Sequence, residues 1–372
     1  MTVIKPDSYN PRRPDHFHES CGSGSTTVAR MLGTPAIATI GVIGAGAWGT
    51  ALARHVAEKG LSVTLWAYEK EVAEAIRTRH ENSPYLPSVR LPASLRATND
   101  LAEATREADC LVFAVPSHAA RPVLQEIAGS LDRAVPLLSA TKGIEEESLK
   151  LVTQIMEEVL PRSMASRLLV LSGPSFATEV SRAHPTALCL AGKDPGLVKQ
   201  LQSLFMTPAF RVYADSDPIG VQLGGALKNV MALAAGVVDG LNLGANARAA
   251  LITRGLAEMI RLGVAMGADP RTFYGLSGVG DLVLTCTGAL SRNHSVGVRL
   301  GKGERLEAIL ASMHAVAEGV RTAKAALGLA QRHQVEMPIV QEVHNVLFSD
   351  KSCRQAVGDL MERDAKEEKN PV

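Results

Sequence analysis

The first clear pattern along the chain is an apolar run, a glycine-rich turn and a helical stretch. Residues 37–43 are apolar and rich in β-branched side chains, as is typical of a buried parallel strand. The sequence Gly-Ala-Gly-Ala-Trp-Gly follows at 44–49 and precedes a predicted helix from Thr50 to about Lys59. A second apolar run, 61–67, comes after Gly60. The pattern therefore predicts a strand, a tight turn, a helix and a second strand.

The same α/β pattern continues towards the middle of the chain. Further strands are predicted at 110–115, 135–139, 168–172 and 186–191. The first three end in polar or glycine-rich segments at 116–117, 140–143 and 173–177. Ligands of open α/β sheets bind beyond the carboxyl ends of the strands. We therefore expect these three segments to lie at one edge of the sheet.

The pattern becomes helical after about residue 217. Residues 219–239 are apolar nearly all round, which predicts a helix buried in a domain core. Further helices are expected at 247–266, at 282–287, after 291–294 and from Pro338. We therefore expect an α/β domain over 36–217 and a helical substrate and catalytic domain over 218–372.

Residues 1–35 belong to neither predicted domain. They mix Pro, Arg, His, Ser and Gly without periodicity, which favours a disordered extension or a true start at Met31. A secretory signal is not expected, because no apolar core of ~7–15 residues follows a basic start. Arg12 and Arg13 keep an organellar transit peptide open, although Asp7, Asp15 and Glu19 argue against it.

The composition argues against several classes of function. The 372 residues are 46% hydrophobic and 21% charged with a net charge of +1, typical of a globular protein without the charge expected for binding nucleic acid or an anionic membrane. No uninterrupted apolar run reaches the ~20 residues of a membrane span. The five scattered cysteines contain no CxxC pair, so we expect reduced thiols, a cytoplasmic location and no metal site.

The glycine-rich turn predicts a dinucleotide site. Gly44 would allow the tight turn, Gly46 would let a pyrophosphate approach the backbone, and Gly49 would permit close packing of helix and strand. Free N–H groups at the start of the helix would face the phosphates. The alternative is an ordinary βα turn, but the flanking strands and helix supply the context that this motif requires.

Residues after the second strand bear on the choice of cofactor. Glu69 lies 20 residues past Gly49, near where an acidic residue binds the adenosine ribose and favours NAD. Tyr68 offers an aromatic face for adenine. Lys70 is close by and leaves NADP(H) open, so we expect NAD(H) to be preferred with NADP(H) as the alternative.

The helix over 219–239 carries one cation, Lys228. Burial of an unpaired ammonium lowers its pKa, which suits a lysine to general acid–base work. Gly224 and Gly225 lie on the same helix face and are expected to leave room for a ligand. The alternative is a lysine that reaches the surface or pairs with a carboxylate.

Three other positions have a functional and a structural interpretation each. Lys142 follows a strand and would contact a phosphate or carbonyl oxygen, or else is a solvated loop lysine. Asp281 stands at a helix start and could be an N-cap. Arg292 and Asn293 near another helix start supply a guanidinium, an amide and free N–H groups, which suit a phosphate.

Six segments taken in order resemble NAD(P)-dependent glycerol-3-phosphate dehydrogenases. The resemblance runs from about Ile37 to about Arg363 and rests on Gly41-Val-Ile-Gly-Ala-Gly-Ala-Trp-Gly-Thr-Ala, Ala140-Thr-Lys-Gly, Ser172-Gly-Pro-Ser-Phe-Ala, Gly220-Val-Gln-Leu-Gly-Gly-Ala-Leu-Lys-Asn-Val, Gly280-Asp-Leu-Val-Leu-Thr-Cys and Ser291-Arg-Asn. It implies an N-terminal Rossmann-type doubly wound α/β domain and an all-α C-terminal domain like that of 6-phosphogluconate dehydrogenase. It also implies reversible reduction of dihydroxyacetone phosphate to sn-glycerol 3-phosphate, which supplies phospholipid synthesis.

The resemblance also assigns residues. Lys228 matches the family's proton donor, Lys142 would hold the substrate and polarise its carbonyl, and Asp281 would orient Lys228. Further substrate contacts match Gly173, Ser175, Asn229, Thr285, Ser291, Arg292 and Asn293. Cofactor contacts match Gly44, Gly46, Ala47, Trp48, Gly49, Tyr68, Glu69, Lys142, Ala177, Arg292, Val316 and Glu318.

Two other functions stay open on the sequence. One is a dehydrogenase of the same two-domain plan that acts on a 3-hydroxy acid; it would not need the phosphate ligands Arg292 and Asn293. The other is a redox-sensing NAD-binding module without turnover, which would not need both lysines. The apolar helical domain makes a homodimer plausible.

Overall fold

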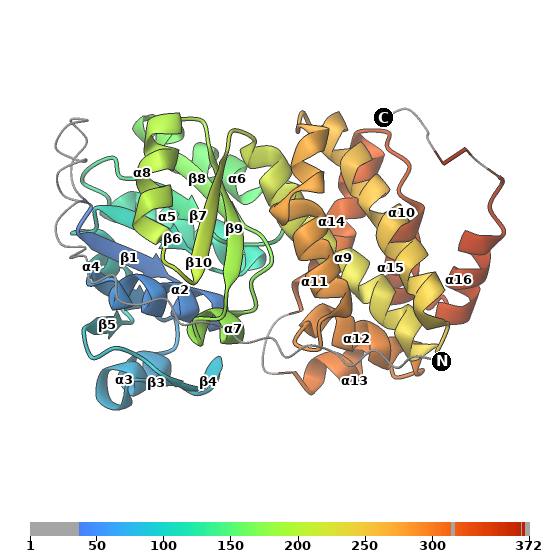
Figure 1. The fold of residues 1–372 in the computed structure, drawn as a ribbon, viewed down its shortest axis with the longest axis horizontal. Helices are drawn as coiled ribbons and strands as arrows, with labels where there is room; N and C mark the ends of the chain where they lie inside the picture. Colours follow the sequence, from blue (N-terminus) through green and yellow to red (C-terminus); the bar gives the residue numbers. More distant parts are fainter. Residues whose placement is uncertain (1–36, 314–316, 366, 369–372) are drawn as a thin grey trace, which may run out of the picture. The chain divides into compact units, whose positions relative to one another are not determined.

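An eight-stranded sheet forms the first part of the described chain (Figure 1). The computed structural model describes residues 37–313, 317–365 and 367–368, so the extension predicted over 1–35 lies outside the described residues. The strand order is β10-β9-β8-β7-β6-β1-β2-β5. The strands are β1 (Thr39–Ile43), β2 (Ser62–Trp66), β5 (Leu95–Thr98), β6 (Cys110–Phe113), β7 (Leu137–Ser139), β8 (Leu168–Ser172), β9 (Thr186–Gly192) and β10 (Phe210–Asp215).

The direction of the strands brings three of the predicted loops together. Strands β5, β2, β1, β6, β7 and β8 run parallel to one another. The carboxyl ends of β6, β7 and β8 therefore share one edge, as predicted. Strand β9 runs antiparallel to β8, and β10 runs parallel to β9, so both of these end at the opposite edge.

Helices cover both faces of the sheet, as the alternation of buried side chains requires. Val42 and Val112 pack with helices α2 (Ala47–Glu58), α3 (Lys70–Arg79) and α8 (Pro195–Phe205). Their neighbours Ile43 and Phe113 pack with α4 (Leu101–Thr105), α5 (Ala120–Ser130) and α6 (Val152–Val159) on the other face. The predicted doubly wound Rossmann-type arrangement is confirmed.

A two-stranded hairpin stands apart from the main sheet. It consists of β3 (Glu81–Asn82) and β4 (Leu86–Arg90), which pair antiparallel. The sequence analysis predicted neither this hairpin nor strands β5 and β10. The hairpin contains two prolines, Pro84 and Pro87, and lacks the alternation that marks a half-buried strand.

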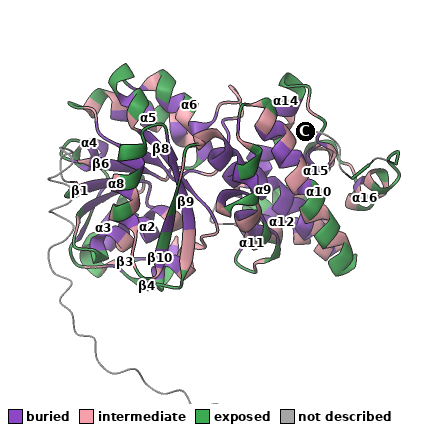
Figure 2. Ribbon diagram, turned by 45° about the horizontal axis from the view of Figure 1, so that its top comes forward, coloured by how far each residue is buried: buried purple, intermediate pink, exposed green. Residues whose placement is uncertain are grey.

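The second part of the described chain is helical. Its helices are α9 (Pro218–Gly240), α10 (Gly244–Ala265), α11 (Asp281–Thr287), α12 (Arg292–Gly301), α13 (Leu306–Ala311), α14 (Glu318–Arg332), α15 (Pro338–Phe348) and α16 (Cys353–Met361). Helix α9 is buried along most of its length and packs against α10, α11, α12, α14 and α15 (Figure 2). Although α9 is long and apolar enough to cross a membrane, 94% of its most apolar window is buried inside the protein. Helix α9 is therefore the core of a helical domain.

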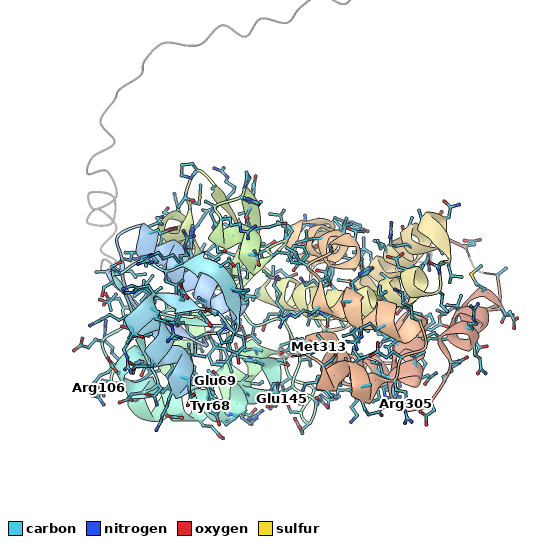
Figure 3. All side chains as sticks on the ribbon, turned by 90° about the horizontal axis from the view of Figure 1, so that it is seen from below. Tyr68, Glu69, Arg106, Glu145, Arg305 and Met313 are labelled. Atoms are coloured by element: carbon cyan, nitrogen blue, oxygen red, sulfur yellow. The ribbon has the colours of Figure 1, made fainter. Side chains whose placement is uncertain are left out.

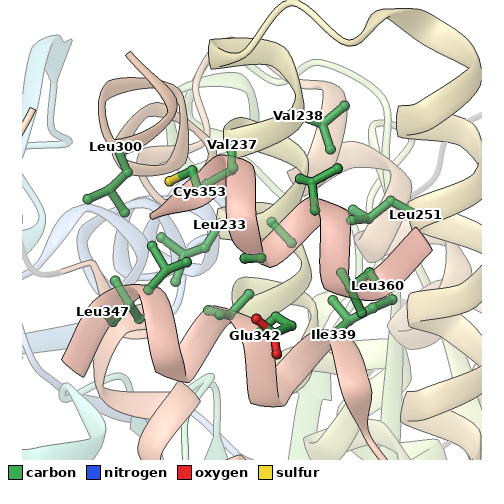
Figure 4. Close-up of a pocket in the computed structure, with 15 residues that line it drawn as sticks. Leu233, Val237, Val238, Leu251, Leu300, Ile339, Glu342, Leu347, Cys353 and Leu360 are labelled. Carbon is green, nitrogen blue, oxygen red and sulfur yellow. The ribbon is translucent and has the colours of Figure 1, made fainter. Parts of the chain in front are cut away.

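A small apolar cavity lies between α9, α15 and α16 (Figure 4). Its volume is about 40 Å³, and its walls are mainly aliphatic, with Leu233, Val343 and Leu360 among them. The one carboxylate in its lining, Glu342, pairs with Lys351 at 2.5 Å. No predicted site residue borders this cavity, and its walls offer nothing to bind a phosphate.

Candidate active site

The glycine-rich turn between β1 and α2 has the geometry predicted for a dinucleotide cradle. Gly44 has a φ of +110°, and a Cβ there would lie 2.8 Å from the carbonyl oxygen of Ala114. A Cβ at Gly49 would collide with the carbonyl of Gly44, so this glycine lets α2 pack closely on the turn. A Cβ at Gly46 would meet no protein atom within 4 Å. The backbone at Gly46 is thus open to a ligand.

The start of α2 leaves backbone donors at this opening. The helix begins at Ala47, earlier than the Thr50 predicted from the sequence, because Gly46 already serves as its N-cap. Gly46 has no side chain to cap the first turn, so the N–H groups around Ala47 and Trp48 are left without a capping acceptor. The indole Nε1 of Trp48 is buried without a hydrogen-bond partner among the described residues. An open cradle and spare donors fit a dinucleotide.

The carboxyl end of β2 lies directly beside the turn. The N–H of Gly44 donates to the carbonyl of Trp66 at 3.1 Å. Tyr68 and Glu69 follow directly after this strand end (Figure 3). The side chain of Tyr68 is 78% exposed, so its ring is free to cover a base. Glu69 accepts a hydrogen bond from the hydroxyl of Tyr85 at 2.7 Å.

Two lysines and one aspartate meet at the carboxyl edge of the sheet. Lys142 follows β7, Lys228 lies in the middle of α9, and Asp281 is the first residue of α11. Lys142 Nζ donates to Asp281 Oδ2 at 2.7 Å, and Lys228 Nζ donates to Asp281 Oδ1. The carboxylate is fully buried, and Lys228 is 6% exposed. Residues 139 positions apart in the chain thus form one cluster of charges.

Burial governs the protonation of this cluster. Removal from water and the neighbouring Lys142 lower the pKa of Lys228 while Asp281 raises it, and the net result is a pKa of about 7. A lysine of this kind exchanges its proton near neutral pH. The sequence analysis treated pairing with a carboxylate as an alternative to catalysis, but the structure shows a paired lysine that burial still makes acidic.

Two expectations about this cluster are wrong. Asp281 does not cap its helix: the N-cap is Gly280, and the aspartate carboxylate binds the two lysines instead. Gly224 and Gly225 do not leave ligand space beside Lys228, because a Cβ at Gly224 would collide with the carbonyl of Ser277 and one at Gly225 would lie 2.5 Å from Ser172 Oγ. These glycines let other segments of the protein approach α9.

Lys142 is also held by the loop after β8. Its Nζ donates to the carbonyl of Gly173 at 2.9 Å and to Ser175 Oγ at 3.4 Å. Gly173 has a φ of +142°, which a side chain would disfavour. Ala177 begins the short helix α7 (Ala177–Ser181) immediately after this loop. The loop therefore presents its polar groups to Lys142, as the strand-end argument predicted.

A chain of amide hydrogen bonds links the cluster to α12 and α14. Asn229 Nδ2 donates to the carbonyl of Lys142 at 3.3 Å, and Asn229 Oδ1 accepts from Asn293 Nδ2 at 2.9 Å. The N–H of Gly319 donates to Asn293 Oδ1 at 3.0 Å. Thr285 donates to the carbonyl of Asp281 at 2.6 Å, one turn along α11.

The start of α12 presents a free guanidinium. Ser291 is the N-cap and accepts from the N–H of His294, so the helix begins at Arg292. Arg292 is exposed and makes no hydrogen bond or ion pair with the residues that the structure describes. The adjacent N–H groups of the first turn lack helical partners. An arginine beside such donors can bind an anion.

Glu318 connects the helical domain to the sheet edge. Its carboxylate accepts from the N–H of Ser117 at 3.1 Å and from the hydroxyl of Ser117 at 2.6 Å. Ser117 follows β6, so this contact lies at the same edge as Lys142. The predicted cofactor contact Val316 lies outside the described residues.

The sequence analysis missed three residues that shape the site. Ser117 was noted only as the end of a strand, and Asn82 and Tyr85 were not singled out. Asn82 Nδ2 donates to the carbonyl of Ala45 in the glycine-rich turn at 2.8 Å. A partner 37 positions away leaves no local signal in the sequence.

Comparison with known proteins identifies one family over both parts of the chain. The family described as NAD-dependent glycerol-3-phosphate dehydrogenase matches in two parts, its N-terminus over residues 39–198 and its C-terminus over residues 217–358. The glycerol-3-phosphate dehydrogenase [NAD(P)+] of Geobacter sulfurreducens is 55% identical over 330 residues, covering 89% of this chain and 98% of the relative.

Solved structures give the same result. The crystal structure of glycerol-3-phosphate dehydrogenase from Coxiella burnetii is 39% identical, with a TM-score of 0.85 over 88% of this chain and all of that chain. The structure of glycerol-3-phosphate dehydrogenase from Saccharomyces cerevisiae is 30% identical, with a TM-score of 0.75 over the same shares. The resemblance thus extends across both domains.

Proposed function

The chain belongs to the NAD-dependent glycerol-3-phosphate dehydrogenase family, and on that premise we propose that it reversibly reduces dihydroxyacetone phosphate to sn-glycerol 3-phosphate. We further propose that NAD(H) is preferred, that NADP(H) is also accepted, and that the product supplies phospholipid synthesis. The observation that carries the proposal is the Lys142–Asp281–Lys228 cluster beside an open dinucleotide cradle.

The buried cluster supplies the proton chemistry in this proposal. The bound nicotinamide supplies the hydride in the direction of reduction. Lys228 gives its proton to the ketone oxygen, which is favourable because burial has lowered its pKa. Asp281 holds the ammonium of Lys228 in place from within the protein. In the oxidation of glycerol 3-phosphate, neutral Lys228 takes the hydroxyl proton back.

Lys142 holds the reacting oxygen in this scheme. Of its three hydrogen bonds, the one to Ser175 Oγ is the longest at 3.4 Å, so we propose that a substrate oxygen replaces this partner. A second cation then stabilises the negative charge that develops on the oxygen as the carbon is reduced. Gly173, Ser175, Asn229 and Thr285 complete the proposed substrate site.

The phosphate of the substrate would bind at the start of α12. Arg292 has a free guanidinium, and the first-turn N–H groups beside it lack partners. The side chain of Asn293 is held by Asn229 and Gly319, which fixes this end of the site relative to Lys142. Ser291 shapes the site as the N-cap.

The remaining cofactor contacts are proposed from the family resemblance. The positions of these residues around the glycine-rich turn and the Lys142–Asp281–Lys228 cluster support the proposal. Ala47, Trp48, Tyr68 and Glu69 border the open glycine turn, while Ala177, Arg292 and Glu318 lie in the loops and helix starts around the cluster. Glu318 already binds Ser117 across the two domains. We place the domain boundary near residue 217, where the sheet has ended and α9 begins.

We also propose a cytoplasmic homodimer. The described cysteines Cys110, Cys189, Cys286 and Cys353 are free thiols, which a reducing compartment would preserve. Most exposed large hydrophobic side chains among the described residues lie in the helical domain, including Tyr274, Leu290 and Met361. Sedimentation of the purified chain would test the assembly.

The experiment that tests the function compares three substrates with the full chain. NADH oxidation is followed with dihydroxyacetone phosphate, with dihydroxyacetone and with a 3-oxo acid, and NADPH replaces NADH in a parallel series. We expect dihydroxyacetone phosphate to be preferred over dihydroxyacetone by about 100-fold or more in kcat/KM, because only the former can bind Arg292. Preference for the 3-oxo acid would indicate the other dehydrogenase class, and cofactor binding without any turnover would indicate a sensor.

A further inference from the structure

The hairpin β3–β4 forms hydrogen bonds with two parts of the proposed adenosine site, the glycine-rich turn and Glu69. From one end of the hairpin, the buried Asn82 donates to the carbonyl of Ala45 and to Thr50 Oγ1, both at 2.8 Å. From the turn between its strands, the Tyr85 hydroxyl donates to Glu69 Oε1 at 2.7 Å. The glycine-rich turn and the carboxylate of Glu69 are therefore fixed relative to each other by a single element.

We propose that Tyr85 is a positioning residue that sets the preference for NAD(H) over NADP(H) by holding the Glu69 carboxylate beside the ribose of the bound dinucleotide. This inference rests on the proposed function, in which Glu69 lies at the adenosine side. Lys70, which follows Glu69, is exposed and is the residue that kept NADP(H) open on the sequence.

The hydrogen bond leaves Glu69 the acceptor that a ribose needs. Oε1 is occupied by Tyr85, while Oε2 receives no hydrogen bond from the described residues. A ribose 2′-hydroxyl can donate to Oε2, whereas a 2′-phosphate would bring a second anion against a carboxylate that cannot turn away. Because Glu69 is only partly buried, it could rotate into solvent without Tyr85.

The surroundings of Tyr85 favour its role in holding the Glu69 carboxylate. Its ring packs against the apolar core that contains residues of β1, β2, α2 and α3, which restricts the movement of the side chain. The hydrogen bond to Glu69, together with burial, raises the pKa of Tyr85 to about 12. The hydroxyl therefore stays protonated and keeps donating throughout the range in which the protein would work.

Calorimetric titration of the full chain with NAD⁺ and NADP⁺ tests the proposal through binding alone. The quantity compared is the ratio of the two dissociation constants, NADP⁺ over NAD⁺, because any loss of folded protein cancels in it. In Tyr85→Phe we expect this ratio to fall by about fivefold or more. NAD⁺ would lose a fixed hydrogen-bond acceptor for its ribose, and the 2′-phosphate of NADP⁺ would no longer face a fixed Glu69 carboxylate. In a Glu69→Gln background, Tyr85→Phe should change the ratio no further.

Matched variants distinguish positioning from structure. Tyr213→Phe removes the hydroxyl of a half-exposed tyrosine on β10 and should leave the ratio unchanged. Tyr85→Met keeps an apolar side chain and serves if Tyr85→Phe is poorly folded, as thermal melting would reveal. A ratio within about twofold of wild type in Tyr85→Phe, or an equal shift in the Glu69→Gln background, would overturn the proposal. Absence of turnover with dihydroxyacetone phosphate would instead contradict the proposed function and leave the ratio informative.

Discussion

Lys228 shows how burial and a partner together determine the behaviour of one residue. An ordinary lysine ion pair keeps its proton far above neutral pH. Here the desolvation of Lys228 outweighs the attraction of Asp281, and the pKa falls to about 7. The residue can therefore change its charge during a reaction without leaving its hydrogen bond to the aspartate.

This pKa predicts opposite pH profiles for the two directions of the reaction. In the proposed mechanism reduction requires protonated Lys228, so kcat/KM for dihydroxyacetone phosphate should fall as pH rises through about 7. The same mechanism requires neutral Lys228 for oxidation, so kcat/KM for glycerol 3-phosphate should rise over the same range. Initial rates in both directions measure this, with NADH binding followed as a control. Two profiles that move in the same direction would contradict the role of Lys228.

Arg292 is expected to act on binding more than on the chemical step. If Arg292 binds the phosphate as proposed, replacement by alanine removes charge-assisted hydrogen bonds made in the ground state and the transition state alike, so KM for dihydroxyacetone phosphate should rise by about 10- to 100-fold. The value of kcat should change much less. Arg299→Ala on the same helix, which removes an ion pair with Glu304, is the matched control. An unchanged KM would exclude Arg292 as the phosphate ligand.

At the scale of elements, the start of helix α15 is stabilised by a side chain that is distant in the sequence. Helix α15 begins at Pro338, and its first free N–H groups, those of Ile339 and Val340, donate to the carboxylate of Glu258 on α10 at 2.7 and 3.2 Å. Glu258 is 1% exposed. Burial raises its pKa from 4.5 to about 7, although the two N–H groups oppose this.

The raised pKa predicts how stability depends on pH. Between pH 4.5 and about 7 the folded protein binds more protons at Glu258 than the unfolded chain, so this residue's contribution to the free energy of unfolding decreases as pH rises through that window. Glu258→Gln should flatten the dependence, as thermal melting across this range would measure. Glu258→Ala should lower the free energy of unfolding by about 2–3 kcal/mol, since two buried N–H groups lose their acceptor.

Exposed Glu307 supplies the control for this prediction, because it lies at the surface of α13 in a loose ion pair with Arg305. Glu307→Gln should leave the pH dependence of the melting temperature as in wild type. If Glu258→Gln gives the same profile as Glu307→Gln, Glu258 is not the group that couples folding to pH.

At the scale of the whole molecule, the features that could be predicted from the sequence are those encoded by neighbouring residues. Strands β1, β2 and β6 to β8 were predicted because parallel, buried strands form continuous apolar runs, and α9 was predicted because it is apolar all round. The glycine-rich turn was predicted because its three glycines keep the spacing of the dinucleotide motif between a strand and a helix. These signals lie within about 20 residues of one another in the chain.

Features that depend on distant segments could not be predicted in this way. The two lysines share Asp281 only because the folded helical domain brings α9 and α11 to the end of β7. The glycines before Lys228 were assigned to ligand space because nothing in the sequence indicates that Ser277 and Ser172 pack there. The antiparallel direction of β9 is likewise set by its pairing with β8. The pairing with a carboxylate that was weighed as an alternative for Lys228 is present, whereas the N-cap weighed for Asp281 is not.

The most direct test of this account is the turnover of a Lys228→Met variant, which keeps the volume of the buried side chain. Dihydroxyacetone phosphate-dependent oxidation of NADH is measured together with the dissociation constant of NADH, and Lys150→Met, at a surface pair with Glu158, is the control. The account predicts that kcat falls by about 100-fold or more in Lys228→Met, as loss of general acid catalysis requires, while NADH binding is retained. A Lys228→Met enzyme whose kcat stays within about threefold of wild type would contradict it.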